Sequence, residues 1–409
     1  MKYATQILLI LWVFLHPIFL TAQTVNTGML YVSEQTTFST VSDFSNEPSA
    51  SFYNDGRSNF YGDIYNQSKF DFYQNTGTIR LVGNKLQRLK GDFLAINNLY
   101  LDNITPEIAF SLEAEMNIYN QAYFQLGVLE NRESEAQINF LNEAIARNAS
   151  HSSHVDGTVF KFGKEDFIFP IGHKSYYRPA SLRQLPIENI VESTYFFEDA
   201  GDLYDRQKKE GLINRISHTE YWEVKIYNPA EAVLSLSYDN STTPSYILNH
   251  INQGEAVHIV RWNERLNAWV DLGGMVDIDA KTVSTTIDKA GIYTLALMKF
   301  NEINPCDIVV YNAVTPNQDG FNDYLKIIND NPGCAKNLKV QIFNRWGVKV
   351  FETDTYGLAG HVFDGYSTGR LTVREGSKLP SGTYFYVLEY QYNENQIHKK
   401  MGYIHLSST

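Results

Sequence analysis

A short polar run in the last quarter of the chain has the residue types of a cation-binding loop. Its side chains are Asn317, Asp319, Gly320, Asn322 and Asp323. Calcium is held by six to eight oxygens, yet Thr315 stands at the first ligand position and Lys326 where a bidentate Glu would close an EF-hand. The run therefore favours a turn in which Asn and Asp satisfy nearby backbone groups, and calcium binding is the open alternative.

Two histidines and two carboxylate pairs are the other candidates for catalysis or metal binding. His151 and His154 are three residues apart, but the run lacks the Glu of an H-E-x-x-H helix and predicts a solvated loop. The carboxylate pairs are Glu133 with Glu135 and Glu165 with Asp166. They are interpreted as surface charges, and a glycosidase pair stays open because only the fold brings such pairs together. No G-x-S-x-G motif precedes a predicted helix. We therefore predict no catalytic residue, metal site or cofactor.

Aromatic side chains are dense in residues 52–73. Rings at this density indicate the core face of a sheet, because they pack well on a pleated surface. The open alternative is a surface that stacks on sugar rings.

The elements that must carry these side chains are strands. Residues 60–66, 69–73, 78–83, 94–103 and 122–129 alternate in period two between Asn, Gly and Asp turns. We predict an N-terminal β-rich domain over residues 23–150, either jelly-roll-like or solenoid-like. No strict repeat period decides between the two.

A central domain is predicted over residues 151–300. Its short strands recur at the spacing of an immunoglobulin-like β-sandwich, and residues 198–218 are a polar insertion expected to hold one short helix. The whole chain is therefore expected to be all-β and multidomain.

Residues 1–22 have the features of a cleavable secretory signal. Lys2 precedes an apolar segment at residues 7–15, and the stretch ends at the small residue Ala22. The apolar segment is shorter than the roughly 20 residues that span a bilayer, and no second run of that length follows. We expect an exported mature chain without a transmembrane segment; an uncleaved anchor is the alternative.

The net charge of −12 is distributed unevenly over the 409 residues. Residues 306–409 carry ten basic and ten acidic side chains, whereas residues 23–305 carry 23 basic and 36 acidic ones. A body with a net charge of −13 repels nucleic acid phosphates, so that partner class is excluded.

The two cysteines, Cys306 and Cys334, are expected to pair. An exported chain permits a disulfide, and no other thiol competes. Two buried free thiols are the alternative.

Turn-forming blocks recur through residues 301–409. They read T-P-N-Q-D-G-F-N-D, F-N-R-W-G, F-D-G and L-P-S-G-T-Y, and each follows a predicted strand. Their residues are Pro316, Asn317, Asp319, Gly320, Asn322, Asp323, Asn344, Arg345, Trp346, Gly347, Asp364, Gly365, Pro380, Gly382, Thr383 and Tyr384.

The order and wording of these blocks resemble the gliding-motility-associated C-terminal domain of Bacteroidetes proteins, the type B sorting domain of the type IX secretion system. The resemblance covers about residues 305–409 and implies a small antiparallel β-sandwich in which the block residues form the sorting motif. It implies passage through the periplasm, then transport across the outer membrane to the cell surface or the medium. The implied partners are the secretion translocon and a small outer-membrane β-barrel.

Three functions remain for the rest of the chain. The first is a non-catalytic structural or adhesive surface protein, with a glycan or another surface ligand as a possible target. The second is a secreted carbohydrate-binding or carbohydrate-active protein whose site lies in the N-terminal β domain. The third is a subunit that docks on an outer-membrane barrel of the export or gliding machinery.

Overall fold

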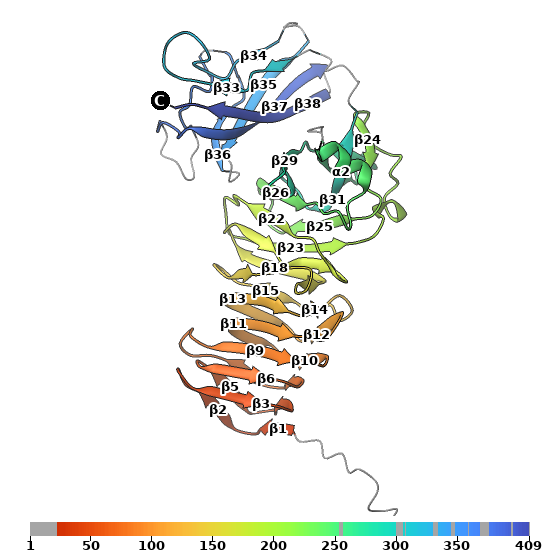
Figure 1. The fold of residues 1–409 in the computed structure, drawn as a ribbon, viewed down its shortest axis with the longest axis vertical. Coiled ribbons are helices and arrows are strands. Elements are labelled where there is room, and N and C mark those ends of the chain that lie inside the picture. The colour runs from red at the N-terminus through yellow and green to blue at the C-terminus, as the bar shows by residue number, and fades with distance from the viewer. Residues whose placement is uncertain are drawn as a thin grey trace, which may run out of the picture.

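The described chain is a tall stack of strands with a separate β domain at one end (Figure 1). The computed structural model describes residues 23–252, 257–299, 306, 308–329, 334–344, 348–358, 360–368, 376–393 and 396–408. Strands dominate throughout, and the all-β prediction is confirmed.

Residues from 23 to about 161 form a parallel β-solenoid with three sheets along its sides. The first sheet contains β1 (Gln23–Asn26), β4 (Asp43–Asn46), β7 (Ile64–Asn66), β10 (Gln87–Gly91), β12 (Ile108–Glu113), β14 (Val128–Glu130) and β17 (Val155–Asp156), and continues into β20 (Ile171–His173) and β21 (Tyr176–Tyr177). The second contains β3 (Thr37–Thr40), β6 (Arg57–Phe60), β9 (Thr78–Gly83), β11 (Leu94–Asn103), β13 (Met116–Leu126), β15 (Ile138–Phe140), β16 (Ile145–Arg147) and β18 (Thr158–Gly163). The third contains β2 (Met29–Val32), β5 (Ser51–Asn54) and β8 (Lys69–Asp71).

Successive coils stack in register, so that equivalent residues lie above one another. Phe44 pairs with Ile64 in the first sheet, and Ser58 pairs with Ile79 in the second. Alternate side chains turn inward, and Phe44 packs edge-on against Phe52 with ring centroids 5.3 Å apart. Burying each such ring contributes about 1.5–3 kcal/mol, so the coils are held together by their shared interior.

Three buried or half-buried asparagines form a ladder along one corner of the first coils. The side-chain amide of Asn26 donates to the side-chain oxygen of Asn46, and that of Asn46 donates to Asn66; each donor–acceptor distance is 2.8 Å. Asn66 then donates to the carbonyl of Phe93 at 2.9 Å. The ladder gives the corner polar groups partners inside the stack. Of the two architectures expected for the N-terminal domain, the jelly roll is wrong and the solenoid is confirmed.

The second sheet runs on beyond the solenoid as antiparallel strands. After β18 come β23 (Asn189–Phe196), β25 (Tyr221–Ile226), β31 (Gly291–Met298), β27 (Val257–Asn263) and β28 (Ala268–Asp271), with β24 (Ile213–Ile216) also on β31. A further antiparallel sheet contains β19 (Phe167–Phe169), β22 (Ala180–Arg183), β26 (Ala232–Ser237), β30 (Thr282–Ile287) and β29 (Met275–Asp277). One hydrophobic cluster extends from Val32 in the first coil to Leu297 in this region. The immunoglobulin-like sandwich expected for residues 151–300 is not confirmed.

The polar insertion expected at residues 198–218 packs beside the end of the long sheet. It contains a short 3-10 helix, Ala200–Asp202, followed by β24. Tyr204 lies against Trp262 and Trp269, with ring centroids 5.3 and 6.2 Å away. The α-helix of this region, α2 (Ser245–Asn252), contacts β27 and β31.

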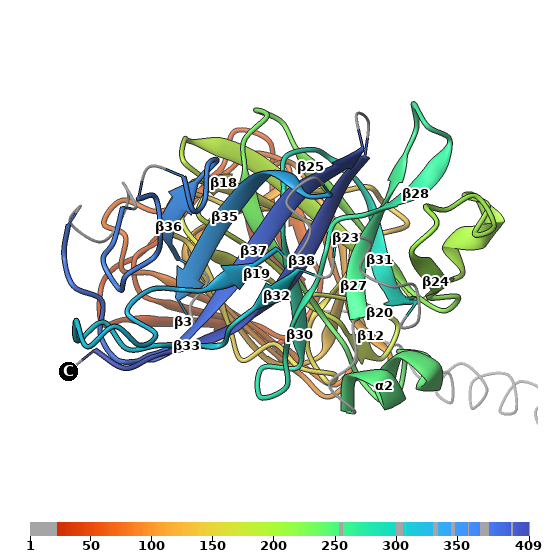
Figure 2. The ribbon, with the colours of Figure 1, turned by 90° about the horizontal axis from the view of Figure 1, so that it is seen from above.

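The C-terminal domain is a small antiparallel β structure with its own core. Its main sheet contains β33 (Ala313–Val314), β38 (Gln396–Leu406), β37 (Gly382–Asn393), β35 (Lys336–Asn344) and β36 (Lys349–Thr353), and β32 (Val309–Val310) pairs with β34 (Ile327–Ile328). The view along the stack shows β35, β37 and β38 lying across its end (Figure 2). Cys306 and Cys334 form the predicted disulfide, with Cα atoms 5.3 Å apart.

Candidate functional site

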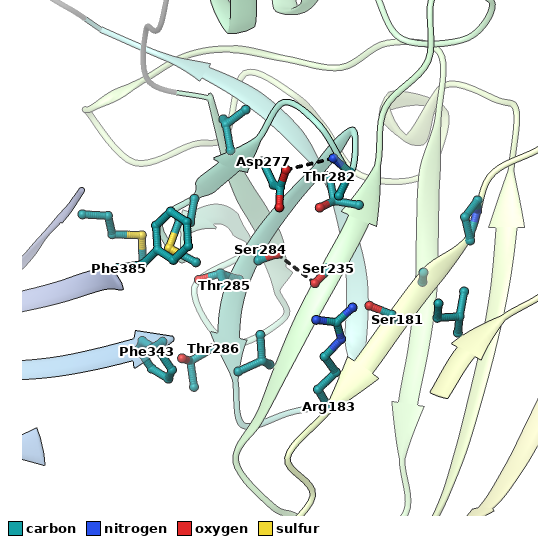
Figure 3. Close-up of a pocket in the computed structure, with 18 of the residues that line it drawn as sticks. Ser181, Arg183, Ser235, Asp277, Thr282, Ser284, Thr285, Thr286, Phe343 and Phe385 are labelled. Carbon is teal, nitrogen blue, oxygen red and sulfur yellow. Dashed lines mark hydrogen bonds between the residues drawn. The ribbon is translucent and has the colours of Figure 1, made fainter. Parts of the chain in front are cut away.

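A cleft of about 280 Å³ lies where the C-terminal domain meets the sheet of β22, β26, β30 and β29 (Figure 3). The C-terminal domain contributes Phe343, Phe385, Val387 and Met401 to its walls. Phe343, Val387 and Met401 also pack with Val233 of β26. The cleft is therefore bounded on one side by a hydrophobic contact between the two parts of the chain.

Hydroxyl groups line the opposite wall. Ser181, Ser235 and Ser284 are cross-strand neighbours on β22, β26 and β30, and Ser284 Oγ donates to Ser235 Oγ at 2.8 Å. Leu182 and Leu234 alternate with them and point into the core, because successive side chains of a strand face opposite sides of the sheet.

The charged residues of the cleft are few. Among the described residues of its lining, Arg183 is the sole cation, Asp277 is the sole carboxylate, and histidine and cysteine are absent. The hydroxyl groups, the guanidinium and the carboxylate of this lining can hydrogen-bond to a small polar molecule.

Polar contacts join the C-terminal domain to the central strands around the cleft. Gln341 donates to Glu231 at 3.3 Å, and the Lys349 ammonium lies 4.0 Å from the same carboxylate. The backbone N–H of Lys349 donates to Gln184 at 3.4 Å. The Lys349 and Glu231 side chains are partly exposed, so their ion pair contributes little to stability.

Asp271, near this junction, is held ionised by its neighbours. Burial acts to raise its pKa, but His258 Nδ1 at 2.9 Å, the Gly273 N–H at 2.8 Å and the charge of Lys399 bring the pKa below its usual range. Glu210 differs, because burial raises its pKa although it accepts the Asp271 N–H at 2.9 Å.

The loop first considered for calcium is closed by its own hydrogen bonds. The Asp323 carboxylate accepts the backbone N–H groups of Asn317, Gln318 and Gly320 at 3.2, 2.6 and 2.8 Å. Asp319 accepts the Phe321 N–H at 2.8 Å and the Asn317 side chain at 2.7 Å, and both lower the pKa of Asp319. The carboxylates thus act as turn anchors. Within the described residues, no group of three or more His, Cys, Asp or Glu is arranged to hold a metal ion.

Several residues of the predicted sorting motif meet at one end of the C-terminal domain. Gly365 has φ +82°, and a Cβ there would lie 3.0 Å from Pro316 Cγ and 3.2 Å from a methyl carbon of Leu406. The Leu379 N–H donates to the Gly365 carbonyl at 2.8 Å, and the Tyr384 hydroxyl donates to the Pro380 carbonyl at 2.8 Å. The F-D-G and L-P-S-G-T-Y blocks thus form one connected corner.

The N-R-W-G block is described only in part. Asn344 ends β35 and its side chain accepts the Val348 N–H at 2.9 Å. Arg345, Trp346 and Gly347 lie outside the described residues. Their part in the sorting motif stays a prediction, as does that of the other block residues.

The two histidines expected in a solvated loop have different environments, and for His154 the expectation is wrong. His154 is fully buried, its Nδ1 and Nε2 each 3.0 Å from the carbonyl oxygens of Ser150 and Lys174. Burial lowers the pKa of His154, and those carbonyls oppose the shift. His151 is exposed, and its Nδ1 accepts the Tyr177 N–H at 3.2 Å.

The carboxylate pairs also separate in the fold. Glu133 and Glu135 are exposed. Glu165 lies 3.2 Å from the Lys161 ammonium, whereas Asp166 accepts the Gln184 N–H at 3.0 Å. The members of this pair therefore have different partners.

The aromatic run divides between the interior and the surface. Phe52, Phe60 and Phe70 are buried in the solenoid, whereas Tyr61 and Tyr73 are 45% and 56% exposed. The core interpretation thus holds for these phenylalanines and for Tyr53, which is 8% exposed, but not for Tyr61 and Tyr73. Tyr61 directly follows the buried Phe60, and period-two alternation is the sequence signal for its outward position.

Within the described part of the chain, no helix is both long and apolar enough to cross a membrane. The search of curated proteins finds no match to the chain. The family model of the CHU_C type IX secretion signal domain matches residues 308–406. This match covers the β domain that contains the predicted sorting motif, and it implies export by the type IX secretion system. Residues 308–406 of the chain are a CHU_C type IX secretion signal domain.

Proposed function

We propose that the protein is a non-catalytic adhesive or structural protein of the cell surface, a stiff rod that its C-terminal sorting domain delivers to the outside. The observation that carries this proposal is continuity. One sheet runs from β3 of the first coil through β23, β25 and β31 to β28, and one hydrophobic cluster follows it as far as β27 and β31 (Figure 1).

A rod of this kind suits display. Each coil adds about 4.8 Å of length, and its core contacts are made to the coils directly above and below. The sorting domain lies at one end, so the first coil projects farthest from it (Figure 1). A large lateral surface is thereby presented along one continuous sheet.

The partners follow from the sorting domain. The translocon of the type IX system binds it during export, and a small outer-membrane β-barrel retains or releases the protein at the surface. A subunit role in the export or gliding machinery is the alternative that such a barrel would favour. A carbohydrate-active enzyme is the other alternative, and the described carboxylate pairs offer it little support because Glu165 and Asp166 face different partners.

Removal of residues 306–409 tests the export step. The truncated protein should fold, since the solenoid and central strands share a core that excludes the sorting domain, and it should accumulate in the periplasm. Surface biotinylation of intact cells, with a periplasmic marker as control, measures its location. Surface labelling of the truncated protein at the level of the full chain would contradict the sorting role.

The adhesive role is tested separately by attachment of wild-type and gene-deleted cells to glass and to polysaccharide-coated surfaces. Reduced attachment after deletion supports the role. A purified chain that hydrolyses a polysaccharide or a peptide would overturn the non-catalytic proposal.

A further inference from the structure

Three tyrosines contact one another at a corner of the first coils. Tyr73 lies flat on Tyr53, with ring centroids 4.1 Å apart and planes 16° apart. It also meets Tyr31 edge-on at 5.6 Å. Tyr31 and Tyr73 are 40% and 56% exposed, whereas Tyr53 beneath them is 8% exposed. We call these three residues the tyrosine platform.

The platform is held in place before any ligand arrives. Tyr31 and Tyr53 are register partners on β2 and β5. The loop that carries Tyr73 is anchored by Asp55, whose Oδ1 accepts the N–H groups of Tyr73 at 3.0 Å and Gln74 at 2.7 Å. Asp55 is only 2% exposed, so this anchor is part of the solenoid interior. Rings fixed in this way lose little conformational freedom on binding.

Polar groups surround the rings. The Lys69 ammonium lies 5.0 Å from the Tyr53 ring centroid and 3.5 Å from the Asp71 carboxylate. The same loop places Phe72 edge-on against Tyr119 at 5.0 Å, and Tyr119 is 40% exposed. The surface thus combines partly exposed aromatic rings with hydrogen-bond donors and acceptors at their margin.

This combination has the chemistry of a sugar-binding surface. A pyranose ring presents an apolar C–H face to an aromatic ring while its hydroxyls reach polar groups at the edge. The contributing residues come from successive coils, so the contact extends along the rod and suits a polymer better than a single sugar. Residues 23–305 carry a net charge of −13, which repels polyanions and favours a neutral chain.

We propose that the tyrosine platform binds a neutral polysaccharide. The inference rests on the proposed adhesive function and names its ligand class. A bound glycan chain would lie over Tyr31 and Tyr73, with Lys69 and Asp71 bonding to its hydroxyls.

Affinity electrophoresis of the full mature chain tests the proposal. Native gels are cast with one soluble polysaccharide each: xyloglucan, β-1,3-glucan, galactomannan, starch or, as a polyanion, alginate. At least one neutral polymer should retard the protein. Tyr73→Ala should raise the apparent Kd about tenfold, because it removes the ring that contacts both others. Tyr73→Phe keeps the ring and should bind nearly as wild type.

Tyr61→Ala is the matched control, since Tyr61 is similarly exposed, follows β6 in the same solenoid and lies outside the platform. It should leave retardation unchanged. Thermal unfolding of each variant verifies that the solenoid is intact. If Tyr73→Ala fails to fold, Tyr31→Ala replaces it. Retardation by no neutral polymer, retardation by alginate alone, or equal retardation of the platform variant and the wild type would each overturn the proposal.

Failure of this inference and failure of the proposed function give different results. If deletion of the gene weakens attachment but Tyr73→Ala does not change polysaccharide binding, adhesion stands and the platform is not its site. If the platform binds polysaccharide but deletion leaves attachment unchanged, the site stands and the adhesive role falls.

Discussion

Replacing Arg178 by methionine should strongly destabilise the central region, because it leaves a carboxylate buried without its cation. Arg178 and Glu220 have side chains 1% and 0% exposed, and their atoms approach to 3.0 Å. Arg178 Nε and Nη2 donate to the two oxygens of Glu220 at 3.1 and 3.0 Å. Nη2 also donates to the Ser237 carbonyl at 2.6 Å.

The magnitude follows from what the substitution leaves behind. Glu220 keeps hydrogen bonds from Tyr195 and Thr243, at 2.9 and 2.6 Å, but loses both charge-assisted bonds from the guanidinium. Burial and this carboxylate together raise the pKa of Tyr195, so the tyrosine cannot supply a proton to neutralise it. Breaking a buried pair on one side costs about 3–5 kcal/mol. A loss of that size lowers the Tm by roughly 6–20 °C in a unit of this size.

Differential scanning calorimetry of the full chain measures the effect, and the double variant Arg178→Met/Glu220→Leu is the control. Removing both charges leaves neither buried ion, so the double variant should unfold above Arg178→Met. A Tm shift under about 2 °C for Arg178→Met would refute the reasoning. So would a Tm shift of the double variant equal to the sum of the shifts of the single variants Arg178→Met and Glu220→Leu.

Two further predictions concern the disulfide and the loss of stability at low pH. Reduction of the Cys306–Cys334 disulfide should destabilise the sorting domain by about 3 kcal/mol and leave the unfolding transition of the solenoid in place. Scanning calorimetry with and without reductant measures both transitions. A single transition that reductant does not change would contradict this prediction. The depressed pKa of Asp271 stabilises the fold fully above the usual carboxyl pKa of about 3.9, and this stabilisation is lost as the pH falls below that value and through the lower pKa of the folded state. The Tm difference between wild type and Asp271→Asn should therefore be largest above pH 5 and shrink toward pH 2, and a difference independent of pH would exclude this origin.

The local chemistry of the chain was readable without a structure. The turn blocks around Asn317–Asp323 and Leu379–Tyr384 point to the sorting domain because their residues and their order resemble those of that family. The pairing of Cys306 with Cys334 needed no geometry, since no other cysteine is available. The all-β class followed from the period-two alternation, which is a property of neighbouring residues.

The sequence alone did not decide between a solenoid and a jelly roll, because the coils differ in length. Phe44 and Ile64 stack 20 residues apart, whereas Ile64 and Leu89 stack 25 apart, so the corner loops hide the repeat. A regular signal does exist in Asn26, Asn46 and Asn66, which share one corner of the stack at a spacing of 20. The spacing of these three asparagines is recognised as a repeat only once the hydrogen-bonded ladder that joins them is known.

Tertiary structure alone decided which side of each strand became surface and which distant strands met. Phe52 and Tyr53 are adjacent and equally aromatic, yet Phe52 lies in the core and Tyr53 supports an external stack. The sequence around His154 predicts a solvated loop, but in the fold the turn between β20 and β21 covers this side chain with the Lys174 carbonyl. The cleft joins Ser181 and Ser284 to Phe343, which is 162 residues beyond Ser181 in the sequence. Alternation along a strand is encoded locally, but burial depends on what packs against it, and those partners are far away in the sequence.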